Sequence, residues 1–200
     1  MKKIALKELT QIRAGYPFRG RLEPIPDGEY LVVQMKDLDK ANGVNWEQLN
    51  RTRLTGRTPR AVIEPGDLLF VARGHANFAA TVGKVPGPAV PSPHFFHLRV
   101  LAGMDIDPAF LAWQINQDTI QRYLAQSAEG TQIPSIRRAV LEEAVITVPD
   151  AQTQRRIVAL NDAVNREAQI YEALAANRQQ MMKLVARQLL VARQLLEAAN

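Results

Sequence analysis

The hydrophobic pattern divides the chain into two parts of different character. Up to about residue 149, short apolar runs alternate with Gly and Pro, a pattern typical of strands and turns. From residue 150 to 197 the chain contains neither Pro nor Gly and is rich in Ala, Gln and Leu, which predicts one helix of about 70 Å. The sequence therefore predicts an α+β protein, with a β-rich domain over residues 1–149 and one long coiled-coil helix over residues 150–200.

Runs rich in Val, Leu and Phe predict the strands of the first part. We expect strands at residues 29–35, 68–72, 79–85, 95–100 and 144–148, and a short helical turn or strand at residues 4–14. The run from Leu68 to Ala72 follows a Pro65-Gly66-Asp67 turn and is apolar throughout, which indicates a strand buried on both faces. Four prolines between residues 85 and 93 exclude a helix there.

Capping residues mark the expected helices. Asp107 and Pro108 begin a helical segment that residues 116–118 divide in two and that Gly130 ends. Pro134-Ser135 are expected to start a short helix, and Pro149-Asp150 to open the long one. Trp113 and Tyr123 are interpreted as core side chains.

Apolar side chains recur every three or four residues along the long helix. The stripe consists of Ile157, Leu160, Val164, Tyr171, Leu174, Met181 and Val185, and it is interrupted by Glu167, Arg178 and Gln188. Since one small domain cannot bury such a stripe, the sequence predicts a partner helix and hence dimerisation. The direct repeat VARQLL, at residues 185–190 and 191–196, is either without consequence or lengthens this helix by about 9 Å.

Composition narrows the class of protein. The hydrophobic fraction is 46%, no window is apolar enough to span a membrane, and the N-terminus is interrupted by charges before a signal core forms, so a cytoplasmic protein is expected. The absence of cysteine excludes disulfides and thiol catalysis. A net charge of +5 favours a polyanionic partner, although a solvated basic surface remains an alternative.

The candidate functional segments of the first part are polar loops that contain arginines. Residues 45–60 combine four arginines with Trp46, and the buried strand at 68–72 runs into Arg73-Gly74-His75-Ala76-Asn77. Arg and Asn form bidentate hydrogen bonds with guanine and adenine edges, and cations bind phosphates, so these loops suit nucleic acid, although ordinary solvated loops look alike. The candidate DNA-binding residues are Arg19, Lys36, Arg51, Arg53, Arg57, Arg60, Arg73, His75, Asn77, Thr131, Gln132 and Arg137.

No motif for catalysis or metal binding accompanies these loops. The chain has no glycine-rich nucleotide-binding motif, no methyltransferase motif and no paired-carboxylate cluster, and His75 has no partner at a convincing spacing. His94 and His97 would lie on opposite faces of a strand, so a metal site there is not expected and each is interpreted as a satisfied surface or core histidine. The sequence thus predicts a protein that is not an enzyme and that holds no cofactor or metal.

Several short motifs together resemble one family. The resemblance rests on Gly15 and Phe18, on Gly66-Asp67-Leu69, on Gly130-Thr131-Gln132 with Pro134-Ser135-Ile136, and on Val148-Pro149 with Gln154 and Ile157. In this order, with a long helix after them, they resemble a target-recognition domain and spacer helix of the specificity (S) subunits of type I restriction–modification systems.

The resemblance implies a function and a set of partners. S subunits are non-catalytic, read a split DNA site through two recognition domains, and hold the domains apart with an antiparallel coiled coil. They recruit methyltransferase subunits, which bind S-adenosylmethionine and methylate adenine, and an ATP-driven nuclease and translocase can join. This chain departs from the usual pattern because it holds one recognition domain and one helix. We expect a half-length form that pairs as a homodimer; the alternatives are pairing with another half-subunit, or a truncated chain.

A second interpretation comes from a different class of protein. The β-rich domain could bind another protein, with the helix as a dimerisation arm and no role for DNA. Salt dependence distinguishes the two interpretations. Phosphate contacts predict a DNA affinity that falls steeply with salt. A protein-binding module predicts little dependence on salt and an apolar surface patch instead.

Overall fold

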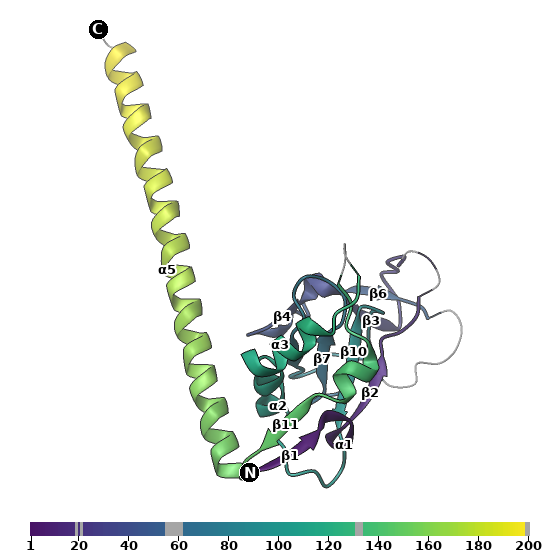
Figure 1. The fold of residues 1–200 in the computed structure, drawn as a ribbon. Helices are drawn as coiled ribbons and strands as arrows, with labels where there is room; N and C mark the ends of the chain where they lie inside the picture. The colour runs from purple at the N-terminus through teal and green to yellow at the C-terminus, as the bar shows by residue number, and fades with distance from the viewer. Residues whose placement is uncertain (19, 21, 55–61, 131–133, 199–200) are drawn as a thin grey trace. The chain divides into compact units, whose positions relative to one another are not determined.

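The computed structural model describes residues 1–18, 20, 22–54, 62–130 and 134–198, and for residues 189 and 191–198 it describes the backbone alone. The chain forms two compact units, Met1–Val158 and Ala159–Asn200. Strands and short helices make up most of the first unit, and α5 (Ala151–Ala198) begins there and runs through the described part of the second. The predicted α+β class is therefore confirmed, with the long helix where the sequence places it (Figure 1).

The largest sheet has four antiparallel strands in the order β2-β10-β7-β8. These strands are β2 (Thr10–Ala14), β10 (Phe95–Val100), β7 (Leu68–Val71) and β8 (Ala79–Thr81). All four residues of β7 are buried, as the sequence predicts for this apolar run. Leu68 and Phe70 belong to one hydrophobic cluster while Leu69 and Val71 belong to another, because successive side chains point to opposite faces of a strand.

A second sheet has the order β6-β3-β9. Its strands are β6 (Asn50–Thr52), β3 (Tyr30–Val33) and β9 (Ala89–Pro91). The β3–β6 pair is antiparallel and the β3–β9 pair is parallel, with Val32 opposite Val90. The sequence did not predict β9, which lies in the proline-rich stretch; Pro is tolerated in a strand at the edge of a sheet. The two-residue strands β4 (Leu38–Asp39) and β5 (Gly43–Val44), also unexpected, form a small antiparallel pair.

The start of the chain pairs with the segment before α5. Residues 4–14, expected as a helical turn or a strand, contain both: the end of β1 (Lys2–Ala5), the single turn α1 (Leu6–Leu9) and the whole of β2. β1 is antiparallel to β11 (Val145–Val148), which the sequence predicts as a strand. The Leu6 amide donates to the Ala144 carbonyl oxygen at 2.9 Å, which extends the pairing into α1.

Three further helices follow the large sheet in the chain, namely α2 (Pro108–Ile115), α3 (Asp118–Gln126) and α4 (Arg138–Glu142). The Asp107 carboxylate accepts a hydrogen bond from the Ala109 amide at 2.7 Å, so the predicted N-cap is confirmed. Two other predicted boundaries are wrong. α3 ends at Gln126 and not at Gly130, and α4 begins at Arg138 and not at Pro134-Ser135.

Tertiary hydrogen bonds explain the late start of α4. Ser135 forms β-bridges with both Arg73 and Glu129, and the Ile136 amide donates to the Ala72 carbonyl oxygen at 2.8 Å. These bonds hold residues 135–136 extended. Ile136 is buried in the core, which fixes this segment against the first unit.

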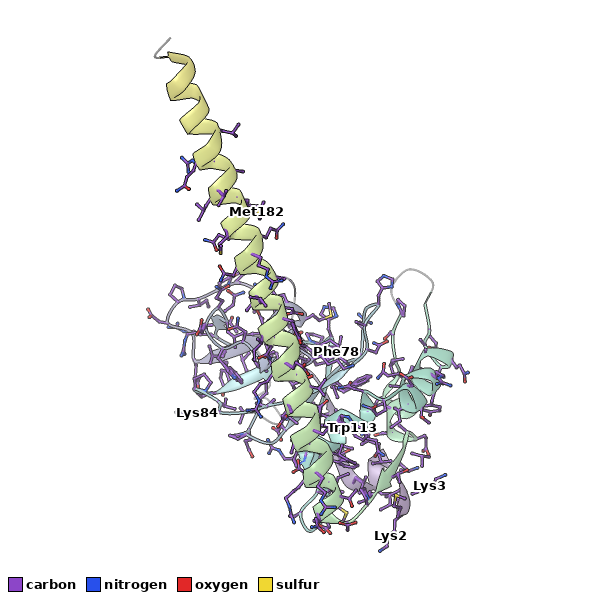
Figure 2. All side chains as sticks on the ribbon, turned by 90° about the vertical axis from the view of Figure 1, so that its left-hand side faces the viewer. Lys2, Lys3, Phe78, Lys84, Trp113 and Met182 are labelled. Carbon is purple, nitrogen blue, oxygen red and sulfur yellow. The ribbon has the colours of Figure 1, made fainter. Side chains whose placement is uncertain are left out.

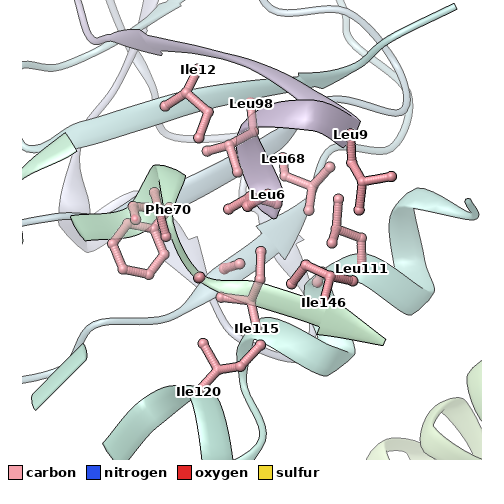
Figure 3. Close-up of a cluster of buried hydrophobic side chains, with 14 of the residues drawn as sticks. Leu6, Leu9, Ile12, Leu68, Phe70, Leu98, Leu111, Ile115, Ile120 and Ile146 are labelled. Atoms are coloured by element: carbon pink, nitrogen blue, oxygen red, sulfur yellow. The ribbon is translucent and has the colours of Figure 1, made fainter. Parts of the chain in front are cut away.

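Two hydrophobic clusters form the core of the first unit. Figure 3 shows part of the larger cluster, where side chains from α1, β2, β7, β10, α2, α3 and β11 meet. Its labelled members are Leu6, Leu9, Ile12, Leu68, Phe70, Leu98, Leu111, Ile115, Ile120 and Ile146. Trp113 and Tyr123 are half-buried and pack against this cluster, in agreement with their interpretation as core side chains.

A buried glutamine fixes the first turn of α5. Gln154 is 1% exposed, and its Nε2 donates to the carbonyl oxygens of Asp105 and Pro149, both at 3.0 Å. Its Oε1 accepts from the Asp107 amide at 2.8 Å, directly before α2. The Asp150 carboxylate caps the helix by accepting from the Thr153 amide at 2.9 Å. The start of α5 is therefore tied to the α2 cap by a single side chain.

The rest of α5 carries apolar side chains that are exposed in the single chain. Among its described side chains the exposed large ones are Leu160, Val164, Ile170, Tyr171, Leu174, Met181, Met182, Leu184, Val185 and Leu190. Figure 2 shows the Met182 side chain standing out from the ribbon of the second unit. In the part of the chain that the structure describes, no helix is both long and apolar enough to cross a membrane.

Candidate nucleic-acid interface

Three polar segments meet where β7 ends. The Ala72 amide donates to the His94 carbonyl oxygen at 2.8 Å, and the Ala72 carbonyl oxygen accepts from the Ile136 amide. One residue further, the Gly74 amide donates to the Pro134 carbonyl oxygen at 3.0 Å. The start of the loop at residues 73–77 is therefore held beside His94 on one side and residues 134–136 on the other.

Three of the predicted DNA-binding residues lie in these segments, and a fourth, Arg137, directly follows the last of them. Arg73 and His75 are exposed, and Arg73 is fixed by its β-bridge to Ser135. Asn77 is half-buried, and its Nδ2 donates to the Val71 carbonyl oxygen at 2.9 Å, which closes the loop onto the end of β7. Arg137 is exposed and forms an ion pair with Glu129 at 3.3 Å.

A hollow of about 420 Å³ adjoins the same end of β7. Its wall includes Phe18, Gln34, Lys36, Ser92 and His94, so it lies between the short helix η1 (Met35–Asp37) and the segment that precedes β10. Among the described residues, the buried Ser92 Oγ and His94 Nδ1 have no hydrogen-bond partner. Buried polar atoms are nearly always paired in native proteins, so these two atoms, on residues that line one hollow, make the hollow a candidate ligand site.

His94 corrects one expectation. It was interpreted as a satisfied histidine, yet its buried Nδ1 has no hydrogen-bond partner in the described part of the chain, whereas His97 is buried and paired. Gly15 lies against the same segment, since a Cβ there would be 1.9 Å from the Ser92 carbonyl oxygen. A side chain at position 15 would therefore displace the backbone that carries Ser92.

The remaining predicted contacts lie elsewhere or outside the described residues. Arg51 and Arg53 are exposed on and beside β6, and an Arg51 guanidinium nitrogen donates to the Gly28 carbonyl oxygen at 3.2 Å. The structure does not describe the other five residues, Arg19, Arg57, Arg60, Thr131 and Gln132. Figure 2 shows that Lys2 and Lys3 lie apart from Lys84, so positive charge is spread over the first unit and charge alone does not define the site.

A buried ionic cluster, which the sequence did not predict, supports the strands behind the site. The Asp67 carboxylate is 2% exposed and accepts hydrogen bonds from Arg99 Nε at 2.7 Å and from Arg99 Nη2 at 2.8 Å. His97 Nε2 lies 2.6 Å from Asp67 Oδ2, and the Glu64 amide donates to the same oxygen at 2.7 Å. Burial alone would raise the pKa of Asp67, but the hydrogen bonds from Arg99 and His97 hold it at about 2.

This cluster also anchors the segment that follows the predicted arginine stretch. Arg99 donates to the Val62 carbonyl oxygen at 3.0 Å and forms an ion pair with Glu64 at 2.9 Å. A signal for the cluster exists in the sequence. Asp67 directly precedes a fully apolar strand, and His97 and Arg99, two residues apart, share one face of another strand. No group of three or more potential metal ligands occurs among the described residues.

The fold is similar to that of known proteins. The S subunit of a type I restriction–modification system from M. genitalium matches 80% of this chain with a TM-score of 0.52 and 17% identity, over 37% of its own length. The HsdS subunit from Thermoanaerobacter tengcongensis matches 86% with a TM-score of 0.60 and 17% identity, over 39% of its own length. A chain from a study of complex assembly and conformational transition in the type I R-M system matches 92%, with a TM-score of 0.64 and 18% identity, over 43% of its own length.

This chain therefore spans about two fifths of the solved chains that it matches. No protein-family model matches the sequence, and no curated protein does.

Proposed function

We propose that this chain, which has the fold of S subunits of type I restriction–modification systems, reads a DNA sequence and directs an adenine methyltransferase to it. The chain is not itself an enzyme in this proposal. S-adenosylmethionine binds to the methyltransferase subunits that it recruits, and a restriction nuclease and translocase can join the same complex.

The meeting of three polar segments at the end of β7 is the observation that carries the proposal. A reader of DNA needs exposed side chains that are held in fixed positions, because each hydrogen bond to a base edge requires a defined direction. The backbone of Arg73 is fixed by its bridge to Ser135, and the Arg137 side chain is held by its ion pair with Glu129. The neighbouring hollow is lined by Lys36, Ser92 and His94, and the Ser92 Oγ and His94 Nδ1 have no hydrogen-bond partner among the residues that the structure describes.

Different residues take different roles in this interface. Lys36, Arg51 and Arg53 are exposed cations suited to phosphate contacts, which position the protein on the duplex without reading the sequence. Arg73, His75 and Asn77 are the candidates for base edges, together with Thr131, Gln132 and Arg137. Arg19, Arg57 and Arg60 complete the proposed set of phosphate contacts.

Two copies of the chain pair through α5 in this proposal, because its exposed apolar stripe requires a partner helix. Two-fold pairing places two identical recognition domains on one DNA molecule, so the expected target is a split site with inverted half-sites. Pairing with a different half-subunit would instead give an asymmetric site.

Selection from a random DNA pool tests the proposed function. The purified chain with its methyltransferase subunit is incubated with a random-sequence duplex pool, and the affinity of the enriched duplex is measured from low to high salt. We expect enrichment of a split site and a log–log salt slope that corresponds to several phosphate contacts. Failure to bind DNA even at low salt would overturn the proposal and favour the protein-interaction module.

A further inference from the structure

The apolar stripe of α5 keeps a regular spacing over the second unit. Its successive positions are alternately four and three residues apart from 160 to 185, and six of them carry the exposed apolar side chains Leu160, Val164, Tyr171, Leu174, Met181 and Val185. This spacing is that of the core positions of a coiled coil. The stripe begins after Val158, because Ile157 and Val158 already pack against the core of the first unit.

Two opposite charges occupy core positions of the same stripe. Glu167 follows Val164 by three residues, and Arg178 follows Leu174 by four, so both fall within the regular spacing. The two residues are eleven positions apart, about 16 Å along the helix, too far to contact one another. Both are exposed, and neither forms an ion pair within the described part of the chain.

These charges discriminate between the ways in which two copies of α5 can pair. A parallel, in-register pair would bury Glu167 against Glu167 and Arg178 against Arg178. An antiparallel pair shifted by one heptad would place each charge against an apolar residue. Both arrangements bury charge without a counter-charge, which is strongly unfavourable.

We propose that two copies of this chain pair through α5 in the one antiparallel register that places Glu167 of each copy against Arg178 of the other. The two-fold axis then passes between Glu172 and Ala173. The inference rests on the proposed pairing of two chains, agrees with the antiparallel direction that the family resemblance implies, and adds the register and the side chains that select it.

The same register matches every apolar layer of the stripe. Leu160 of one copy faces Val185 of the other, Val164 faces Met181, and Tyr171 faces Leu174. An apolar layer opposes an apolar layer in each case, because Glu167 and Arg178 are the two charged core positions of the stripe and they face each other. Because each layer joins the two alternating kinds of core position, the packing is the one expected for an antiparallel coiled coil.

Self-recognition follows from this arrangement. A foreign helix would have to present a cation opposite Glu167 and an acid opposite Arg178, eleven residues apart and in the reverse order. A second copy of the chain meets this requirement by symmetry. The charge pair therefore contributes to partner choice more than to the strength of association.

Charge-swap variants of the full chain test the register. Glu167→Arg alone places Arg against Arg, and Arg178→Glu alone places Glu against Glu, so we expect each to weaken self-association at least a hundredfold in analytical ultracentrifugation. A mixture of the two single variants has every Arg opposite a Glu and should form heterodimers. The double variant should form homodimers again.

A matched control uses charges on the same helix outside the stripe. Glu172→Arg and Arg187→Glu change the net charge equally and should leave the dimer unaffected. Single variants that dimerise as tightly as the original chain, or controls that weaken the dimer to the same degree, would overturn the inferred register.

Cysteine cross-linking gives an independent measurement, because the chain contains no cysteine. A mixture of Leu160→Cys and Val185→Cys chains should form a disulfide-linked pair on oxidation. Neither variant alone should do so, since two copies of position 160 lie about 37 Å apart in this register. Cross-linking of Leu160→Cys with itself would overturn the antiparallel direction.

A monomeric original chain would overturn pairing itself, whereas the DNA selection above tests DNA recognition separately.

Discussion

Arg99 donates two hydrogen bonds to the Asp67 carboxylate, from Nε to Oδ1 at 2.7 Å and from Nη2 to Oδ2 at 2.8 Å. The first residue lies on β10 and the second directly precedes β7, so the pair joins the two central strands of the large sheet. Because Asp67 is buried, its charge is tolerated only with these donors in place.

Removal of this charge should destabilise the first unit. Asp67→Asn leaves the Arg99 and His97 donors without an anionic acceptor in a buried site, and we expect a loss of about 3 kcal/mol in the free energy of unfolding. Urea denaturation followed by circular dichroism measures it. Asp27→Asn, at an exposed turn position, is the control and should cost much less. Equal losses in the two variants would contradict a special role for the cluster.

The same carboxylate should make stability depend on pH in the acid range. The pKa of Asp67 is lowered from an ordinary value of 3.8 to about 2, so its ionised form stabilises the folded state at pH values above about 4. This contribution, about 2 kcal/mol, is lost as the pH falls from 4 to 2. We therefore expect the stability difference between the original chain and Asp67→Asn to shrink over this interval. A difference that stays constant down to pH 2 would contradict the prediction.

Gln154 offers a matched test of how α5 is attached to the first unit. Gln154→Ala removes three hydrogen bonds and leaves the Asp107 amide without its acceptor, so we expect a loss of about 2 kcal/mol or more. Gln152→Ala changes the same residue type at an exposed position of the same turn and should be nearly neutral. The two variants are compared by thermal and urea unfolding.

Variants of Arg73 and Lys84 distinguish a specific contact with DNA from a general effect of positive charge. If Arg73 contacts DNA, Arg73→Gln should weaken binding and reduce the salt slope by about one unit if the contact is to phosphate. Should the contact be to a base, the selected sequence should change at one position instead. Lys84→Gln removes an exposed charge outside the three polar segments and should change neither. Equal effects of the two substitutions would indicate that only net charge matters.

Much of the fold could be predicted from local sequence. β7 is recognisable because an apolar run after a Pro-Gly-Asp turn needs no knowledge of its neighbours, and the cap at Asp107 is local as well. β9 was missed because its partner β3 is distant in sequence and pairs in parallel. The start of α4 was misplaced because the cap-like residue Ser135 is held extended by bridges to Arg73 and Glu129.

In the candidate site, too, local features could be predicted from the sequence and contacts between distant segments could not. The arginine-bearing loops and the loop after β7 were visible as polar stretches beside apolar runs. The unpaired state of Ser92 and His94 was not, because whether a polar atom has a partner depends on every segment packed around it. Likewise Asp67 was visible as a turn residue, but its partners His97 and Arg99 are thirty or more positions away.

The hydroxyl of Ser92 should matter for binding and not for folding. Since Ser92 Oγ is buried without a partner among the described residues, Ser92→Ala should leave the free protein as stable as before, or more stable by about 1 kcal/mol. The same substitution should weaken binding to the selected DNA if the hollow receives part of that ligand. Ser127→Ala is the matched control, because Ser127 Oγ donates to the Tyr123 carbonyl oxygen at 3.0 Å. This control should lose about 1 kcal/mol of stability and keep its DNA affinity. A Ser92→Ala variant with unchanged affinity and an unchanged selected sequence would show that the hollow does not receive the DNA.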